Sequence, residues 1–225
     1  MTANLLKTTA MALGLAAVAG CASNAPDPVT HDGLQLRPDT QFREVYVKPG
    51  ASLEGFEAYG LADCQVAFRS NWLRDQNRDR VNLSNRVTQE DVDRIKDSLG
   101  ALCDQHFREA LTEPPPYNLV DEFENGERVL ILQPSIVDLD VAAPDTRSPG
   151  VTRTYTTEAG EMTLFLEIRD ATTNETLVRV VDRQRSPDFG RLQWTNGVTN
   201  SADAARILRR WTKLLREGLD SATGG

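Results

Sequence analysis

Two long amphipathic segments, 89–111 and 202–222, constrain the fold of this chain most strongly. Each repeats apolar side chains at the spacing of one helix face, and such a helix has to bury that face against another layer. The apolar stripes contain Val92, Ile95, Leu99, Leu102, Cys103, His106 and Ala110 in the first segment, and Ala204, Ile207, Leu208, Trp211, Leu214, Leu215 and Leu219 in the second. Strand patterning lies between them. We therefore expect an α+β fold, with an antiparallel (mixed) sheet and the two long helices packed on one face, in a single domain.

The residues around each segment predict where its helix begins and ends. Thr88 is the expected N-cap of the first helix, and Asp91 three positions later approximates a capping box. Three prolines at 114–116 are expected to end this helix, since proline lacks a backbone N–H and clashes with the preceding turn. Ser201 is the expected N-cap of the second helix.

Short apolar or alternating runs predict strands at 44–47, 65–68 and 161–169. A further strand is predicted at 128–141, where a continuous apolar run at 129–132 indicates burial on both faces and the pattern alternates only after Pro134. In this strand, Pro134 predicts a bulge or bend, because it removes a hydrogen-bond donor from the ladder. After Pro134, the side chains of Val137, Leu139 and Val141 are expected to face inward and those of Asp138 and Asp140 outward. In the strand at 161–169, Met162, Leu164, Leu166 and Ile168 share one face. Turn residues at 172–175 then predict a hairpin with a strand at 176–183.

The N-terminus has the pattern of a bacterial lipoprotein signal peptide. Lys7 precedes an apolar run at 10–19 that is too short to cross roughly 30 Å of hydrocarbon but suits a signal-peptide core. Val18, Ala19, Gly20 and Cys21 form a lipobox, so Cys21 is expected to carry acyl chains, palmitate among them. The alternative is an ordinary secretory signal with an incidental cysteine.

This pattern divides the chain into three parts. Residues 1–20 are expected to be a lipoprotein signal peptide, 21–43 the lipidated cysteine and a flexible tether, and 44–222 an α+β periplasmic domain. The residue after the lipidated cysteine is Ala22 and not aspartate, which by analogy with enterobacterial sorting rules favours the outer membrane. We expect the protein at the periplasmic face of that membrane.

Cys64 and Cys103 are the two cysteines that remain once Cys21 is lipidated. An even pair in an oxidising periplasm predicts a disulfide, and two buried thiols are the alternative. Cys103 lies on the apolar arc of the first helix, where a strand that carries Cys64 could meet it. No CxxC spacing supports a redox-active role.

Charge indicates which partners this chain can bind. The formal net charge of −8 argues against nucleic acid, which requires a basic surface. Against that balance, five cations lie on one side of the last helix: Arg206, Arg209, Arg210, Lys213 and Arg216. They could contact anionic lipid head groups or an acidic partner, or form a solvated face that pairs with the protein's own carboxylates.

Few residues have the pattern of a catalytic or metal site. His106 could serve as a general base, but a buried histidine hydrogen-bonded to backbone is the more common arrangement. The acidic run 121–127 lacks the ligand spacing of an EF-hand, with Phe123 at the third position and Leu132 at the twelfth. We expect no metal, no cofactor and no enzymatic activity. Phe189 and Trp194 are a candidate aromatic contact patch or a cover for the end of the core.

The order of features from 32 to 219 resembles a proteobacterial lipoprotein family, domain-of-unknown-function family 3313. The pieces that carry the resemblance are the sequence Asp32-Gly33-Leu34, the strand through Val45-Tyr46-Val47-Lys48-Pro49, Gly160-Glu161 with Glu167 and Asp170, and the last helix with Trp211. The resemblance implies location and fold more than chemistry, since the family has no established activity.

Two functions fit these observations. The first is a lipid-anchored envelope protein without catalytic activity that docks on or assists another envelope component. The alternative is a lipoprotein that binds a small ligand or a cell-wall fragment, with the loops 143–157 and 186–200 as the rim of its site.

Overall fold

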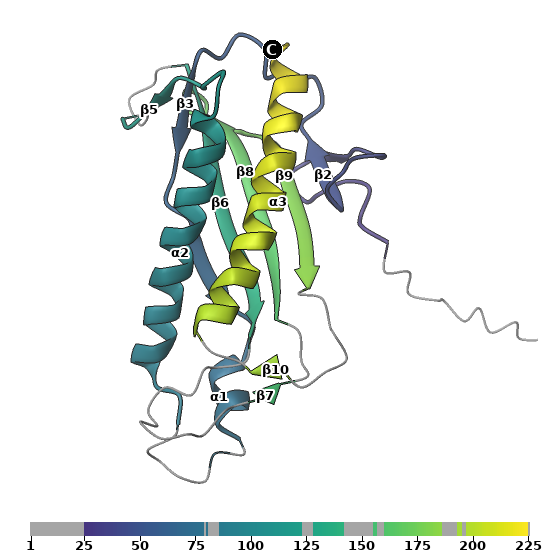
Figure 1. The fold of residues 1–225 in the computed structure, drawn as a ribbon. Coiled ribbons are helices and arrows are strands. Elements are labelled where there is room, and N and C mark those ends of the chain that lie inside the picture. Colours follow the sequence, from purple (N-terminus) through teal and green to yellow (C-terminus); the bar gives the residue numbers. More distant parts are fainter. Residues whose placement is uncertain are drawn as a thin grey trace, which may run out of the picture.

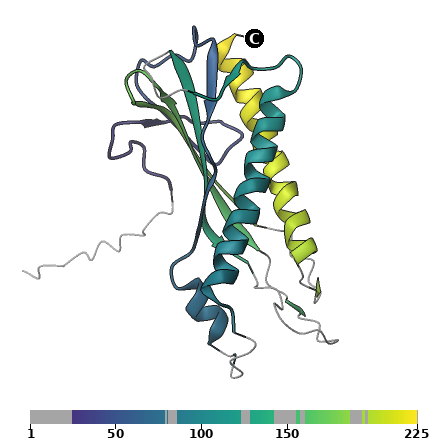
Figure 2. The same ribbon diagram turned by 90° about the vertical axis from the view of Figure 1, so that its left-hand side faces the viewer.

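Two long helices lie side by side on one face of a mixed sheet (Figures 1 and 2). The computed structural model describes residues 25–78, 80, 86–122, 128–141, 155–156, 160–185, 193–194 and 197–224. Its elements are β1 (Gln35–Leu36), β2 (Glu44–Val47), β3 (Ala58–Leu61), β4 (Gln65–Phe68), α1 (Trp72–Asn77), α2 (Gln89–Thr112), β5 (Leu119–Val120), β6 (Val129–Asp140), β7 (Tyr155–Thr156), β8 (Glu161–Asp170), β9 (Thr176–Arg185), β10 (Gln193–Trp194) and α3 (Gly197–Thr223). The α+β fold with two long helices on one face is confirmed.

The sheet mixes antiparallel and parallel pairs. Seven of its eight strands follow the order β1-β2-β9-β8-β6-β3-β5, and β4 also pairs with β6. The antiparallel ladders β6–β8 and β8–β9 are the longest, and β6 pairs in parallel with β3 and β4. The predicted hairpin is confirmed as β8 and β9, with Asn174 of its turn at φ 57°. Met162, Leu164, Leu166 and Ile168 of β8 are all buried in the main core, as their alternation predicts.

Pro134 lies where β6 changes its parallel partner. β3 pairs with β6 as far as Leu132, and β4 pairs with it from Ser135 onward. Pro134, which has no backbone N–H to donate, therefore falls between the two parallel partners. On its other side it pairs with Leu166 of β8 without a register shift. The predicted irregularity at Pro134 is wrong in position.

The bulge in β6 lies a few residues further on. The register with β8 shifts between Val137 and Asp140, where Asp138 has φ 51°. Because a bulge inserts an extra residue, it breaks the strict alternation of faces. Ile136 and Leu139 are both in the buried core, whereas Val137 is only partly buried, so the predicted inward position of Val137 is wrong.

The ends of the two helices differ in how well local signals predict them. α2 begins at the predicted N-cap: Asp91 N donates to Thr88 Oγ1 at 3.3 Å, and Thr88 N donates to Asp91 Oδ2 at 2.9 Å, which completes the capping box. α2 ends at Thr112, just before the prolines. α3 begins at Gly197, so Ser201 lies within the helix and its predicted role as N-cap is wrong. Serine is tolerated in a helix interior, and no proline interrupts residues 197–201.

A buried carboxylate joins the sheet to α3. Asp182 on β9 is 4 % exposed, and its Oδ2 accepts hydrogen bonds from Trp211 Nε1 and Gln184 Nε2, both at 2.7 Å. Its Oδ1 accepts from the backbone N–H of Arg43 at 2.9 Å. Trp211 is fully buried. These three donors satisfy the carboxylate and tie the last helix, β9 and the chain before β2 together.

The segment before β2 is part of the folded domain. Leu34 and Phe42 are buried, and β1 pairs with β2. The described part of this segment lies at the β2 edge of the sheet (Figure 1), and Gln41 Nε2 donates to Glu217 Oε2 of α3 at 3.4 Å. The predicted flexible tether across 21–43 is therefore wrong for its later part, because the isolated apolar side chains at 34 and 42 insert into the fold. Residues 21–24 lie outside the described residues.

Asp32 holds this segment against β9. Its Oδ1 and Oδ2 accept from Nη1 and Nη2 of Arg179 at 3.0 and 2.6 Å, and Thr30 Oγ1 donates to Oδ1 at 2.6 Å. Arg179 also donates to Glu167 on β8. The hydrogen bonds from Arg179 hold the pKa of Asp32 well below its usual range. A two-point contact of this kind fixes the direction of the carboxylate as well as its position.

Asp32→Ala is expected to ease local opening of the segment by about 1 kcal/mol, or roughly fivefold in hydrogen exchange of the Leu36 and Arg37 amides. These amides bond Pro28 O and Val45 O. Because the pKa of Asp32 is lowered in the fold, its contribution is complete above the ordinary carboxylate pKa of about 3.9 and is lost as the pH falls through the folded value. The exposed Glu54→Ala is the control. Unchanged exchange at neutral pH in Asp32→Ala would contradict this role.

Candidate functional site

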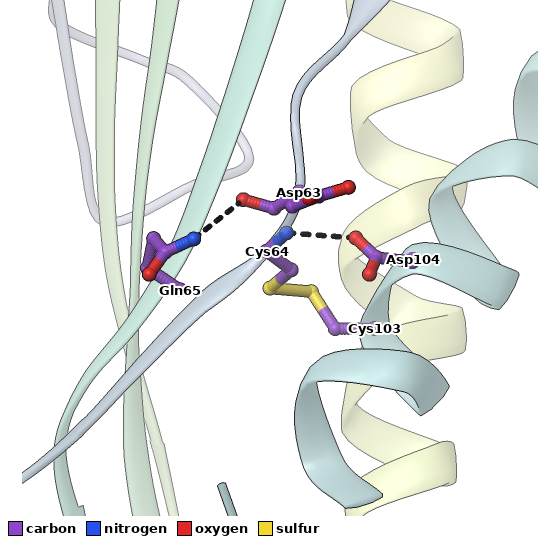
Figure 3. Close-up of a disulfide and its surroundings, with 5 residues drawn as sticks. All are labelled: Asp63, Cys64, Gln65, Cys103 and Asp104. Atoms are coloured by element: carbon purple, nitrogen blue, oxygen red, sulfur yellow. Dashed lines mark hydrogen bonds between the residues drawn. A yellow bond between two sulfur atoms is a disulfide. The ribbon is translucent and has the colours of Figure 1, made fainter. Parts of the chain in front are cut away.

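The disulfide predicted between Cys64 and Cys103 is confirmed. Cys64 immediately precedes β4 and Cys103 lies on α2, with their Cα atoms 6.1 Å apart (Figure 3). Both residues are buried, and Cys103 is fully enclosed. Neither thiol is available as a nucleophile or metal ligand. The bond instead fastens α2 to the part of the sheet where β4 joins β6.

Two neighbours of the disulfide bring strand and helix close together. Asp104 Oδ1 accepts from the backbone N–H of Cys64 at 2.7 Å (Figure 3), and burial raises the pKa of the Asp104 carboxyl. A Cβ atom on Gly100 would lie 3.2 Å from Cys64 O. Glycine at this position therefore allows the close approach of α2 to the backbone before β4.

Four of the five predicted cations on α3 form an exposed basic face. We define the basic face as Arg206, Arg209, Arg210 and Lys213, all of them exposed. Arg206 Nη1 lies 3.0 Å from Asp203 Oδ1, and Lys213 Nζ lies 3.8 Å from Glu217 Oε1. Within the described residues, no carboxylate pairs with Arg209 or Arg210. The basic face is thus only partly neutralised by its own helix.

Arg216 does not belong to this face, which corrects the prediction. Its side chain is only 12 % exposed and pairs with Asp220 at 2.9 Å. Nη1 donates to Ala110 O at 2.9 Å and to Glu113 O at 3.0 Å, and Nη2 donates to Pro115 O. The last carbonyl groups of a helix lack partners within the helix, so the guanidinium group satisfies them at the end of α2.

A tyrosine completes the Arg216 cluster. Tyr117 donates through its hydroxyl to Asp220 Oδ1 at 2.6 Å, and its ring centroid lies 4.6 Å from the Arg216 guanidinium carbon. Burial raises the pKa of Tyr117 to about 12, and the hydrogen bond to Asp220 acts in the same direction. Arg216 is therefore committed to joining the ends of the two helices, and it is not available to a partner.

An exposed acidic face lies on α2, and sequence reasoning missed it. We define the acidic face as Glu90, Asp93 and Asp97, all exposed, which share one side of the helix at spacings of three and four residues. Glu90 lies 3.3 Å from Arg94, and Asp93 accepts from Gln89 at 2.8 Å. Asp97 has no such partner in the described part of the chain. The i, i+3, i+7 spacing of these carboxylates is the sequence signal that could have revealed the face.

His106 is buried beside a carboxylate of its own helix. It is 9 % exposed, and its Nδ1 lies 3.3 Å from Glu109 Oε2, so the expected backbone partner is replaced by a side chain. Its Nε2 is buried and has no hydrogen-bond partner among the described residues. Nε2 is therefore closed to solvent, and Nδ1 faces the exposed carboxylate of Glu109.

Several predicted features lie outside the described residues. They include Cys21, Phe123, Phe189, most of the loops 143–157 and 186–200, and the side chain of Trp194. Within the described ranges, no group of three or more His, Cys, Asp or Glu side chains is placed to hold a metal ion. In the same residues, no helix has the length and apolar character needed to cross a membrane.

Comparison with known proteins adds little to these observations. No protein-family model matches the chain, and no curated protein matches it significantly. Among solved structures, the PelC dodecamer from Paraburkholderia phytofirmans matches with a TM-score of 0.37 and 8 % identity, over 76 % of this chain and 96 % of that one. A neuraminyllactose-binding hemagglutinin homolog from Helicobacter pylori matches with a TM-score of 0.31 and 4 % identity, over 76 % of this chain and 89 % of that one. At such values, function has to be derived from the residues of this chain itself.

Proposed function

We propose that this chain is a lipid-anchored periplasmic protein of the bacterial outer membrane that docks on or assists another envelope component, without catalytic activity. The observation that carries the proposal is the buried Cys64–Cys103 disulfide. Disulfides persist in oxidising compartments and are rare in the cytosol, so this bond supports export of the chain. The lipobox that ends at Cys21 supplies the matching route and the anchor.

The chemistry of the described residues supports docking more than catalysis. Both described cysteines form the disulfide, and the Nε2 of His106 is buried. Exposed charged side chains instead form the acidic face of α2 and the basic face of α3. Surfaces of this kind steer and orient partners, which suits a protein that works by association.

Cys21→Ser is expected to remove all acyl mass and to move the protein from the membrane fraction to the soluble periplasmic fraction. Without the thiol no thioether to diacylglycerol can form, and the acyl chains supply the membrane affinity. Intact-mass spectrometry and cell fractionation measure both effects. Ala22→Asp is the matched control: it should keep the acyl mass but move the protein to the inner membrane. Membrane retention of Cys21→Ser with no acyl mass contradicts the anchor.

The docking role is tested by crosslinking in living cells. Purification of the crosslinked wild-type protein should recover a second envelope protein, joined to residues within 44–222, and mass spectrometry identifies the linked positions. Cys21→Ser should weaken this crosslink, because the anchor concentrates the domain at the membrane. Wild-type envelope behaviour on deletion, with no protein crosslinked, would refute docking. Binding of cell-wall fragments in that case would favour the ligand-binding alternative.

A further inference from the structure

We propose that copies of this chain associate side by side, with the basic face of α3 on one copy docked against the acidic face of α2 on the next. The surfaces involved are those defined above: Arg206, Arg209, Arg210 and Lys213 on α3, and Glu90, Asp93 and Asp97 on α2. This association goes beyond the proposed function and does not depend on the lipid anchor.

The acidic face points toward the β4 edge of the molecule, away from α3, whereas the basic face points away from the sheet. Asp104 lies seven residues after Asp97, hence on the same side of α2, and it bonds the backbone of Cys64 just before β4. On α3, the basic face lies opposite the buried side chains of Leu208, Trp211 and Leu215, so it points away from the sheet. β4 pairs with β6, whereas α3 is joined to β9, on the other side of β8, by the hydrogen bond from Trp211 to Asp182. One copy therefore cannot bring its own two faces together, whereas two copies can.

The faces match in length and are opposite in charge. Their charged residues span positions 90–97 and 206–213, which is about 10 Å of helix in each case at ~1.5 Å per residue. Within the described residues, Arg209 and Arg210 have no carboxylate partner, and Asp97 has no cationic partner. Side-by-side docking gives each of these groups a partner of opposite charge.

A second copy fits the basic face better than an anionic membrane does. The formal net charge of the chain is −8, so the molecule as a whole is repelled by an anionic bilayer. Another copy carries the same overall charge, but at the point of contact it offers the acidic face, which matches the basic face in length. Short-range complementarity of this kind decides docking within a Debye length of about 8 Å at physiological salt.

The directions of the helices add a geometric condition. α2 and α3 run in the same direction along the sheet (Figure 1), so α3 of one copy can lie along α2 of the next with every copy upright in the same sense. The contact uses two different surfaces of the chain, which makes it heterologous and able to continue from copy to copy.

The test uses the full chain with Cys21→Ser, so that acyl chains do not bring copies together. Variant A carries Arg209→Glu and Arg210→Glu, and variant B carries Asp93→Lys and Asp97→Lys. Variant A leaves the α3 face without net charge, and variant B gives the α2 face a positive one, so each variant alone loses the attraction between the faces. Light scattering after size-exclusion chromatography should then show at least about a tenfold weaker association than the parent. An equimolar mixture should restore pairing between A and B, because the unaltered basic face of B can dock on the unaltered acidic face of A.

The control and the contrary results separate the other partners. Glu54→Lys with Glu57→Lys reverses two exposed carboxylates elsewhere and should leave association unchanged. High salt should weaken the parent association. A parent chain that stays monomeric at low salt, or variants that associate alone, would overturn the proposal. The basic face binds lipid instead if phosphatidylglycerol vesicles bind the parent and B but not A, and if mixing A with B does not restore association between copies. Circular dichroism of A and B checks that both fold.

Discussion

Trp211→Ala is expected to lower the free energy of unfolding by about 3–5 kcal/mol, the range for removing a large aromatic side chain from a core. Trp211 is fully buried, and it belongs to the main cluster that α3 forms with β6 and β8. Its loss also removes the Nε1 donor at 2.7 Å from Asp182 Oδ2. Urea unfolding followed by circular dichroism measures the change by linear extrapolation.

Trp211→Phe separates the hydrogen bond from the packing. Phenylalanine keeps most of the apolar area but leaves the buried Asp182 carboxylate with one donor fewer, so a loss of about 1–3 kcal/mol is expected. Trp72→Phe is the matched control, since the Nε1 of Trp72 donates to the neutral carbonyl of Val141 and not to a carboxylate. Hydrogen bonds to charged groups are the stronger kind, so the control should lose less. Equal losses in both variants would contradict a special role for Asp182.

Cys64→Ala with Cys103→Ala is expected to lower the free energy of unfolding by roughly 3 to 4 kcal/mol. The bond closes a loop with a sequence separation of 39 residues, and on the chain-entropy model a loop of this length restricts the unfolded chain by about that amount. The wild-type protein in reductant should show the same lower stability in urea. The double variant itself should not respond to reductant, which is the control.

A separate measurement tests the pairing. Non-reducing digestion and mass spectrometry of the exported protein should yield one peptide that links Cys64 to Cys103. Free thiols at both positions would refute the disulfide. A reduced wild-type protein as stable as the oxidised one would show instead that the bond forms without constraining the unfolded state.

Local chemical signals predicted the long elements well. The apolar stripe and capping box of α2, the β8–β9 hairpin and the cysteine pair each rest on residues near in sequence or on a compartment rule, and the structure confirms all of them. The errors arise where contacts with residues distant in sequence determine whether a side chain is buried or exposed. Leu34 and Phe42 are single apolar residues in a polar stretch, and only the sheet they contact makes them core residues.

The basic face of α3 was predicted only in part, again because contacts distant in sequence are involved. Helical spacing correctly placed four cations on an exposed side of α3. It could not exclude Arg216, because the carbonyl groups that hold this side chain belong to the end of α2, about a hundred residues earlier. The bulge in β6 is a further case: Asp138 adopts a positive φ through its register with β8, which no pattern within the strand encodes.

The bond between Cys64 and Cys103 also bears on how the chain responds to cleavage. A protease that cuts once anywhere between these residues opens the loop that carries α1 without releasing either part, because the two pieces stay covalently joined. The nicked protein should therefore migrate as one band on a non-reducing gel and as two on a reducing gel. In a compartment that contains proteases, such a chain can lose the continuity of its backbone and still keep α2 attached to the sheet.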